Sequence, residues 1–188
     1  LSLQQRSAAH LSALRMRTGL TVHLAILEQN EAVLISKHDG ASGARLATWV
    51  GKRMDLHCTA IGKAMLAFLP DSEIETIIQE HGLARHNENT ICTPRRLRDE
   101  LERIVKNGYA LDDEEDELGL RCIGVPVLGP GNRPLAAISL AGAASAIAPQ
   151  DLARLAGELR QTAAAISHSV EDFMTSLTMA DVIATVAC

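Results

Sequence analysis

The sequence has few aromatic residues and no dense basic segment, and each shortage excludes a class of protein. Aromatic side chains make up 2% of the 188 residues, with one Trp and one Tyr. The chain therefore offers few platforms on which nucleic-acid bases could stack. No stretch concentrates Lys and Arg as neutralising DNA phosphates requires. We expect that this chain, by itself, does not bind nucleic acid.

Long apolar runs and paired cysteines are also missing. No apolar run approaches the roughly 18 to 20 residues that span a bilayer, and the first residues lack the pattern of a signal peptide. The four cysteines are too few for a disulfide scaffold at this length, and none is spaced as C-x-x-C. We expect a soluble cytoplasmic protein with reduced thiols and no membrane partner.

The net charge of −5 is concentrated in one segment, because Asp112 to Glu117 are six consecutive acids. Such a run is most often a solvated loop. This one, however, leads into an apolar stretch that begins at Cys122. An acidic residue at the mouth of an apolar pocket can accept hydrogen bonds from a ligand, and Asp112 and Glu115 are the candidates for that role.

The periodicity of apolar residues predicts an α+β fold. Helical spacing predicts helices over residues 3–18, 59–69, 71–81 and 94–107 and from Pro149 onward, with Thr59 and Thr93 as N-caps and a capping box formed by Ser72 and Glu75. Alternation and turn residues predict hairpins over 20–37 and 122–140 and a further strand over 44–50. Hairpin-linked strands are antiparallel, so we expect an antiparallel sheet of about five to six strands flanked by helices.

The turn from Leu56 to Ala64 combines small residues with a helix start. It is not a phosphate-binding Walker A loop, since His57 replaces the first glycine and Ala64 replaces the Ser or Thr that binds magnesium. Two interpretations remain. The small residues pack the helix against the sheet, or the free backbone N–H groups of Ala60 and Ile61 hold a ligand carboxylate.

Cys122 and Ser139 lie within apolar predicted strands. Cys122 could be a nucleophile only beside a base, for which His57 is the candidate, but a lone cysteine in such a strand is more often an inert small hydrophobe. Ser139 lacks the Gly-x-Ser-x-Gly context of a hydrolase, and its hydroxyl is expected to bond to the backbone.

The sequence gives no recognised metal-ligand spacing. Cys122, Asp112 and His57 do not form one, and His81 and His86 are expected to be solvent-exposed at a helix end and in a connector. We therefore expect neither a metal site nor a cofactor.

Taken together, three segments resemble the C-terminal domain of the IclR family of bacterial transcription regulators. They are the run from His57 to Ala64, the run from Gly108 to Val127, and Ala136 to Ser139. The most specific part is the spacing Gly-x-x-x-Asp-x-x-Glu-x-x-x-x-x-x-Cys, at Gly108, Asp112, Glu115 and Cys122.

The resemblance implies a GAF- or profilin-like effector-binding domain over residues 1–174, followed by a tail of unassigned role over 175–188. It also implies an upstream winged helix-turn-helix domain that this chain lacks and that alone would contact DNA. Members of the family are homodimers or homotetramers, and their effector is a small organic or aromatic acid, so the resemblance implies a sensor with no catalytic activity. The alternative is a cysteine-dependent enzyme with Cys122 as nucleophile and His57 as base.

By position, the resemblance also implies a set of pocket residues. Leu46, Met54 and Leu120 would line the effector pocket, and polar or backbone contacts would come from Ala60, Ile61, Asp112, Cys122 and Ser139. One departure affects this wall, because Ala141 stands where the family often has a second serine. The missing hydroxyl suggests a less polar ligand or a different way of holding it.

Overall fold

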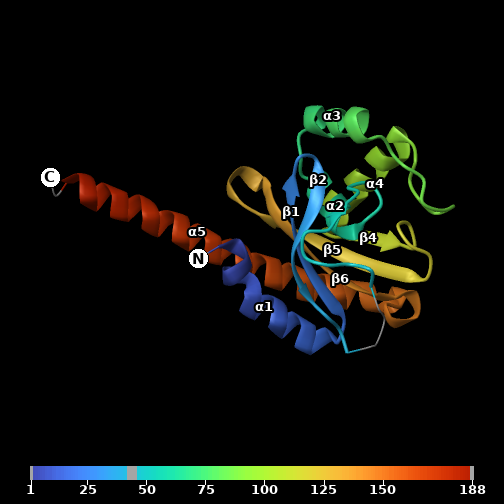
Figure 1. Ribbon diagram of the computed structural model, residues 1–188, viewed down its shortest axis with the longest axis horizontal. Helices are drawn as coiled ribbons and strands as arrows, with labels where there is room; N and C mark the ends of the chain where they lie inside the picture. The colour runs from blue at the N-terminus through green and yellow to red at the C-terminus, as the bar shows by residue number, and fades with distance from the viewer. Residues whose placement is uncertain (1, 42–45, 187–188) are drawn as a thin grey trace.

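The computed structural model of the chain describes residues 2–41 and 46–186, with the side chains of the last helix described as far as Asp172. One antiparallel sheet of order β3-β2-β1-β6-β5-β4 forms its centre. The strands are β1 (Thr21–Glu28), β2 (Glu31–His38), β3 (Arg53–Met54), β4 (Ala110–Asp113), β5 (Leu120–Leu128) and β6 (Pro134–Ala143). Helices α1 (Leu3–Thr18) and α5 (Leu152–Val186) cover one face, and α2 (Ala60–Leu66), α3 (Asp71–His81) and α4 (Pro94–Asn107) lie over the other (Figure 1). The predicted α+β fold with an antiparallel sheet is confirmed.

Both predicted hairpins are present, and both build the centre of the sheet. Gln29 and Asn30 have positive φ angles of 51° and 62°, as a tight turn between twisted strands requires. β5 and β6 pair along their whole length, and β1 pairs with β6 in the register Val22 to Leu140. The first and last strands of the chain are therefore neighbours.

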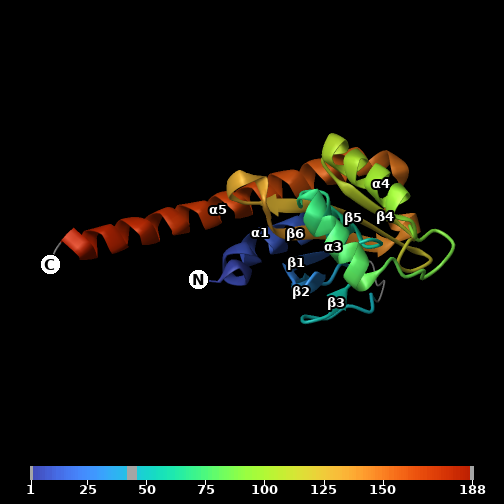
Figure 2. The same cartoon turned by 90° about the horizontal axis from the view of Figure 1, so that it is seen from above.

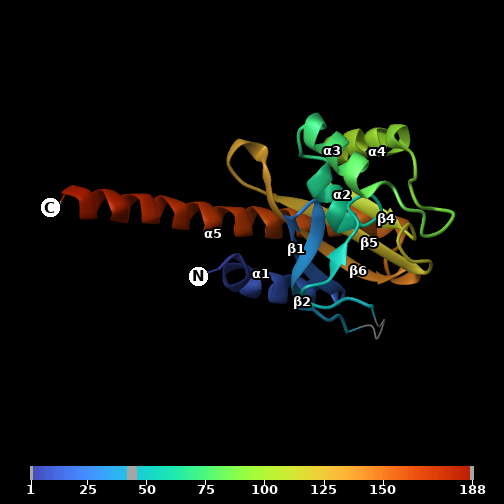
Figure 3. The same ribbon diagram turned by 45° about the horizontal axis from the view of Figure 1, so that its top comes forward.

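The alternation of side chains along the central strands separates two environments. Val22, Leu24, Ile138 and Leu140 face α1 and α5 and are fully buried with residues such as Leu159. The residues between them on β1 and β6 point to the opposite face, over which α2 begins. Figures 2 and 3 show α1 and α5 on one side of the sheet, with α5 continuing well beyond it.

The helix ends follow the local sequence closely. Thr59 and Thr93 cap α2 and α4 by accepting hydrogen bonds from the backbone N–H groups of Gly62 and Arg96, as predicted. A short 3-10 turn, Pro149–Asp151, precedes α5. Among the helices that the structure describes, none is both long and apolar enough to cross a membrane.

The strand predicted over 44–50 is wrong where the structure describes it. Residues 46–50 form no strand, and residues 44 and 45 lie outside the described residues. The chain turns here, with the N–H of Thr48 bonded to the carbonyl of Leu46, and Trp49 is 59% exposed. Leu46 is buried, but Ala47, Trp49 and Val50 are exposed, so no alternating face forms here and the strand comes later, at Arg53–Met54.

Two further expectations are corrected. The capping box of Ser72 and Glu75 is absent, because α3 begins at Asp71 after Pro70 and has no side-chain cap; Glu75 instead forms an ion pair with Arg98. The acidic run is not entirely a loop either, since its first residues belong to β4. In that strand Asp112 pairs directly with Cys122, which ties the start of the run to the central sheet.

Candidate functional site

A cavity of about 50 Å³ lies between the sheet and the start of α2. All eight residues that the sequence predicts for a ligand pocket line it, namely Leu46, Met54, Ala60, Ile61, Asp112, Leu120, Cys122 and Ser139. Residues outside that predicted set complete the wall, namely His23, Ala47, Thr48, Lys52, Thr59, Asp116, Glu117 and Ala141. The predicted residues are therefore brought together from four strands, one helix start and one loop.

Strand register explains how distant residues meet in this cavity. His23 pairs with Ser139 across β1 and β6, and Cys122 pairs with Ala141 across β5 and β6. Their strand neighbours in sequence point into the opposite core. One stretch of the sheet thus presents an imidazole, a hydroxyl and a thiol to the same space.

The start of α2 forms the opposite wall. Thr59 occupies two of the first N–H groups, because its hydroxyl accepts from Gly62 at 3.1 Å and its carbonyl accepts from Lys63 at 2.9 Å. No hydrogen bond to another described residue occupies the N–H groups of Ala60 and Ile61. These two donors are available to a carboxylate.

The small residues at this helix start also have a packing role. A Cβ atom on Gly124 of β5 would lie 2.9 Å from the carbonyl oxygen of Ala60, and one on Gly62 would lie 2.6 Å from the Cα of Leu56. Glycine at 124 lets the helix approach the sheet, and glycine at 62 lets the turn before α2 fold against the helix. The packing interpretation therefore holds, and the close approach leaves Ala60 and Ile61 in the cavity wall.

Asp112 is the buried acid of the cavity, with 4% of its surface exposed. Its Oδ1 accepts hydrogen bonds from the backbone N–H groups of Glu115 at 2.8 Å and Asp116 at 3.4 Å, while Oδ2 has no partner among the described residues. Burial raises the pKa of Asp112 to about 7, although the bond from Glu115 and the charge of Lys63 lower it. Near neutral pH, Asp112 can therefore donate or accept a proton at the cavity.

Glu115 has a different position from the one expected. It does not line the cavity, and its Oε1 lies 2.7 Å from Nζ of Lys63. Lys63 is completely buried and also bonds to Glu100 at 2.9 Å and to the carbonyl of Leu111 at 2.6 Å. Burial raises the pKa of Glu115 and outweighs the opposing charge of Lys63. This ion-pair cluster joins α2, α4 and the acidic segment beneath the cavity.

His23 was missed by the sequence reasoning, although a histidine between Val22 and Leu24 breaks the apolar pattern of its strand. Its Nε2 lies 2.9 Å from the hydroxyl of Thr48, which connects the sheet to the loop above the cavity. Burial, and to a lesser extent the charge of Lys37, lower the pKa of His23 to about 4. His23 is neutral at physiological pH.

The structure does not bring Cys122 and His57 together as a nucleophile and its base. Cys122 lines the cavity, whereas His57 is not among the lining residues and bonds through Nε2 to the carbonyl of Ala84. Burial raises the pKa of the Cys122 thiol well above its usual range, and the charge of Asp112 raises it further. A buried thiol beside carboxylates stays protonated and is therefore unreactive.

The sequence and the fold both match known proteins. Residues 1–168 match a family described as the C-terminal domain of the bacterial transcriptional regulator IclR. The chain is 34% identical over 170 residues to the HTH-type transcriptional regulator XynR of Escherichia coli K12, covering 90% of this chain and 68% of that protein. It spans about half to two thirds of the length of the curated relatives that it matches.

Two solved structures illustrate the likeness in fold. The Thermotoga maritima IclR protein has a TM-score of 0.86 at 35% identity, over 89% of this chain and 68% of that one. An IclR homologue from Microbacterium hydrocarbonoxydans, solved in complex with 4-hydroxybenzoate, has a TM-score of 0.81 at 22% identity, over 90% of this chain and 68% of that one.

Proposed function

This chain belongs to the IclR family of bacterial transcriptional regulators, as an effector-binding domain, and from that premise we propose that its cavity binds a small organic or aromatic acid and thereby modulates promoter binding. The observation that carries the proposal is the convergence of the eight predicted pocket residues on one cavity with unpaired polar groups in its wall. On the helix side are the free N–H groups of Ala60 and Ile61, and on the sheet side are Oδ2 of Asp112 and the hydroxyl of Ser139, which have no partner among the described residues.

In the proposed pose the ligand carboxylate accepts hydrogen bonds from Ala60 and Ile61. The body of the ligand lies against the side chains of Leu46, Met54 and Leu120. A hydroxyl or similar group of the ligand reaches Asp112 or Ser139 on the sheet side. Mostly apolar walls with a few fixed polar groups are typical of small-molecule sites.

The size of the cavity implies that binding requires movement. At about 50 Å³ it has room for only a few water molecules, each of which needs about 10 to 15 Å³ by this measure. The wall from Leu46 to Lys52 is neither helix nor strand, and Lys37 holds it through a 3.0 Å bond from Nζ to the carbonyl of Thr48. We propose that an effector displaces this wall and stabilises the displaced form.

The output of the domain is then a shift in population. An effector that prefers one form of the wall changes the balance of forms by its differential affinity. In the whole protein this change would reach an upstream winged helix-turn-helix domain within a homodimer or homotetramer. Promoter binding would take place in the bacterial cytoplasm, and the domain would catalyse no reaction.

Thermal-shift and calorimetric titrations test the proposal, with 4-hydroxybenzoate, benzoate and short aliphatic acids as ligands. The neutral amide of each acid is the matched ligand control. At least one acid should raise the melting temperature where its amide does not, and Asp112→Ala and Ser139→Ala should each weaken that binding. Ser36→Ala, a change in a buried hydroxyl outside the cavity, should leave it unchanged. If no acid stabilises the chain beyond the effect of the same concentration of salt, the proposal is wrong.

A further inference from the structure

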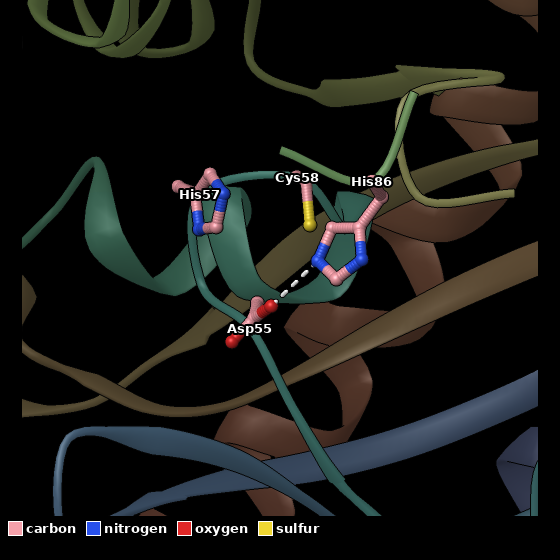
Figure 4. Close-up of side chains that lie close together, drawn as sticks. All are labelled: Asp55, His57, Cys58 and His86. Atoms are coloured by element: carbon pink, nitrogen blue, oxygen red, sulfur yellow. Dashed lines mark hydrogen bonds and ion pairs between the residues drawn. The ribbon is translucent and has the colours of Figure 1, made fainter. Parts of the chain in front are cut away.

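A second group of potential ligand side chains lies beside the cavity but outside it. Asp55, His57, Cys58 and His86 each offer one donor atom, and these four atoms lie within 4.8 Å of one another. The first three precede α2, and His86 lies in the connector between α3 and α4. Figure 4 shows the sulfur of Cys58 between the two imidazole rings, with Asp55 below them.

We propose that these four residues form a Zn²⁺ site. Two imidazoles, one thiolate and one carboxylate are a donor set that zinc accepts in tetrahedral geometry. Tetrahedral bonds of about 2.0 to 2.3 Å place the donors roughly 3.3 to 3.8 Å apart. The widest donor pairs, at up to 4.8 Å, thus need to approach by about 1 Å, and the 2.8 Å pair of Asp55 and His86 needs to separate by about 0.5 Å, both within the reach of side-chain rotation.

The hydrogen bond of His57 prepares it for this role. A carbonyl oxygen only accepts hydrogen bonds, so the 2.9 Å contact between Nε2 of His57 and the Ala84 carbonyl requires the proton on Nε2. The lone pair is then on Nδ1. A backbone carbonyl that fixes one ring nitrogen in this way is the usual outer-shell partner of a metal-binding histidine.

The four ligands consist of two buried side chains and two partly exposed ones. His57 and Cys58 are buried, whereas the side chains of Asp55 and His86 are 40% and 35% exposed. Asp55 and His86 already contact each other, with Oδ2 and Nε2 2.8 Å apart. The buried pair would anchor a metal ion, and the exposed pair would let it enter and then close around it.

The surrounding charge also favours a cation. The thiol of Cys58 lies 3.8 Å from a carboxylate oxygen of Asp116, which adds a second acid beside the donor set. Asp116 also lines the cavity, and Thr59, which follows Cys58, caps α2. A bound ion would therefore tie the connector that carries His86 to the wall of the cavity. The inference does not rest on the proposed effector.

The test uses the 188-residue chain after treatment with a chelator and removal of that chelator. Titration with Zn²⁺ should give one tightly bound ion per chain. Titration with Co²⁺ should give the intense visible bands of tetrahedral cobalt and a thiolate-to-cobalt charge-transfer band in the near ultraviolet. His86→Ala and Cys58→Ser should each weaken Zn²⁺ binding by more than about 100-fold, since loss of even an outer-shell partner costs about 10- to 100-fold.

Two control variants make the result specific. Cys122→Ser removes the thiol of the cavity, and His168→Ala removes the histidine of an exposed His–Asp pair on α5 with 3.5 Å between its atoms. Both should keep the Zn²⁺ affinity and the charge-transfer band. The inference is overturned if the wild-type chain binds no Zn²⁺ at micromolar concentration, if His86→Ala binds it unchanged while folded by circular dichroism, or if Cys122→Ser rather than Cys58→Ser loses the band. Acid binding measured in the presence of chelator tests the proposed effector separately.

Discussion

Lys63 and Glu115 are joined by a 2.7 Å ion pair beneath the cavity, and no part of the lysine side chain is exposed. Glu100 and the carbonyl of Leu111 complete the partners of the ammonium group. Oε2 of Glu115 is buried without a hydrogen-bond partner among the described residues. A buried ion pair that solvent water does not reach therefore holds the acidic segment against α2.

Replacing Lys63 should strongly destabilise the domain. Lys63→Met removes the cation but leaves two carboxylates in the interior, and breaking a buried pair in this way costs about 3 to 5 kcal/mol. Urea unfolding followed by circular dichroism measures the change. Arg98→Ala, which breaks the exposed pair with Glu75, should cost less than about 1 kcal/mol. Similar losses from the two variants would contradict the role assigned to Lys63.

Asp112 should make the stability of the domain depend on pH. Its pKa rises from 3.8 to about 7 on folding, so the native state binds more protons than the unfolded state between these values. The free energy of unfolding should therefore fall as pH rises from 4 to 7, and Asp112→Asn should lack this contribution. Between pH 4 and pH 8 the free energy of unfolding of the wild type should fall by on the order of 2 to 4 kcal/mol more than that of the variant, at about 1.4 kcal/mol per pKa unit.

Denaturant unfolding at several pH values measures this difference. Asp99→Asn, at an exposed position of α4, is the control and should follow the wild type at every pH. An Asp112→Asn curve parallel to that of the wild type between pH 4 and 8 would show that burial does not perturb this carboxyl.

Binding of an organic acid should tighten as pH falls through 7. The cavity already contains Asp112, Asp116 and Glu117, and protonation of Asp112 removes one of these charges from beside the ligand. Burial is the main cause of the raised pKa of Asp112; the charges of Glu115 and Asp116 also raise it, whereas the hydrogen bond from Glu115 and the charge of Lys63 lower it. If binding requires the protonated form, affinity for a benzoate should rise about tenfold between pH 8 and 6, since the protonated fraction rises by that factor around a pKa of 7.

Calorimetry at matched ionic strength measures this dependence, because the ligand itself stays ionised throughout this range. Asp112→Asn should bind the acid with little dependence on pH. The amide of the same acid should show none with the wild type. A wild-type affinity that is constant from pH 8 to 6 would exclude a coupled protonation.

Cys122 should react slowly with iodoacetamide at neutral pH. Burial keeps its thiol protonated, and alkylation requires the thiolate. Cys92 and Cys122 are both partly exposed, so mass spectrometry after timed alkylation should find Cys92 modified first because the Cys122 thiol is held protonated. His57→Ala should leave the rate at Cys122 unchanged. Rapid modification of Cys122 that depends on His57 would support the enzyme alternative instead.

The features predicted best from the sequence are those, such as helix starts and ends, that depend on residues close together along the chain. Thr59, Thr93 and Gly19 end or begin helices through their own side chains or backbone, and each was found. The strand expected over 46–50 failed because alternation indicates a strand only where a sheet edge receives it, and the edge of β2 pairs with Arg53 and Met54 instead. The pocket residues came from the resemblance to a family, whose motif spacing carries information that periodicity does not.

Other features depended on distant partners and could not be read from one segment. Lys63 lies in a helix of apolar and small residues, and the sequence does not show that Glu100 and Glu115 lie on either side of it. His86 looked like an exposed connector residue because its neighbours in sequence are polar. Only the folded chain brings it to Asp55 and Cys58.

The pairing of β1 with β6 has a consequence for biosynthesis. During synthesis, one edge of β1 can pair with β2 soon after both strands are made. The other edge stays unpaired until β6, which contains Ala141, the partner of Thr21, has left the ribosome. Until then the growing chain carries an open strand edge and an uncovered apolar surface, a state prone to aggregation. Slow synthesis should therefore prolong dependence on chaperones, and truncation before β6 should yield insoluble protein.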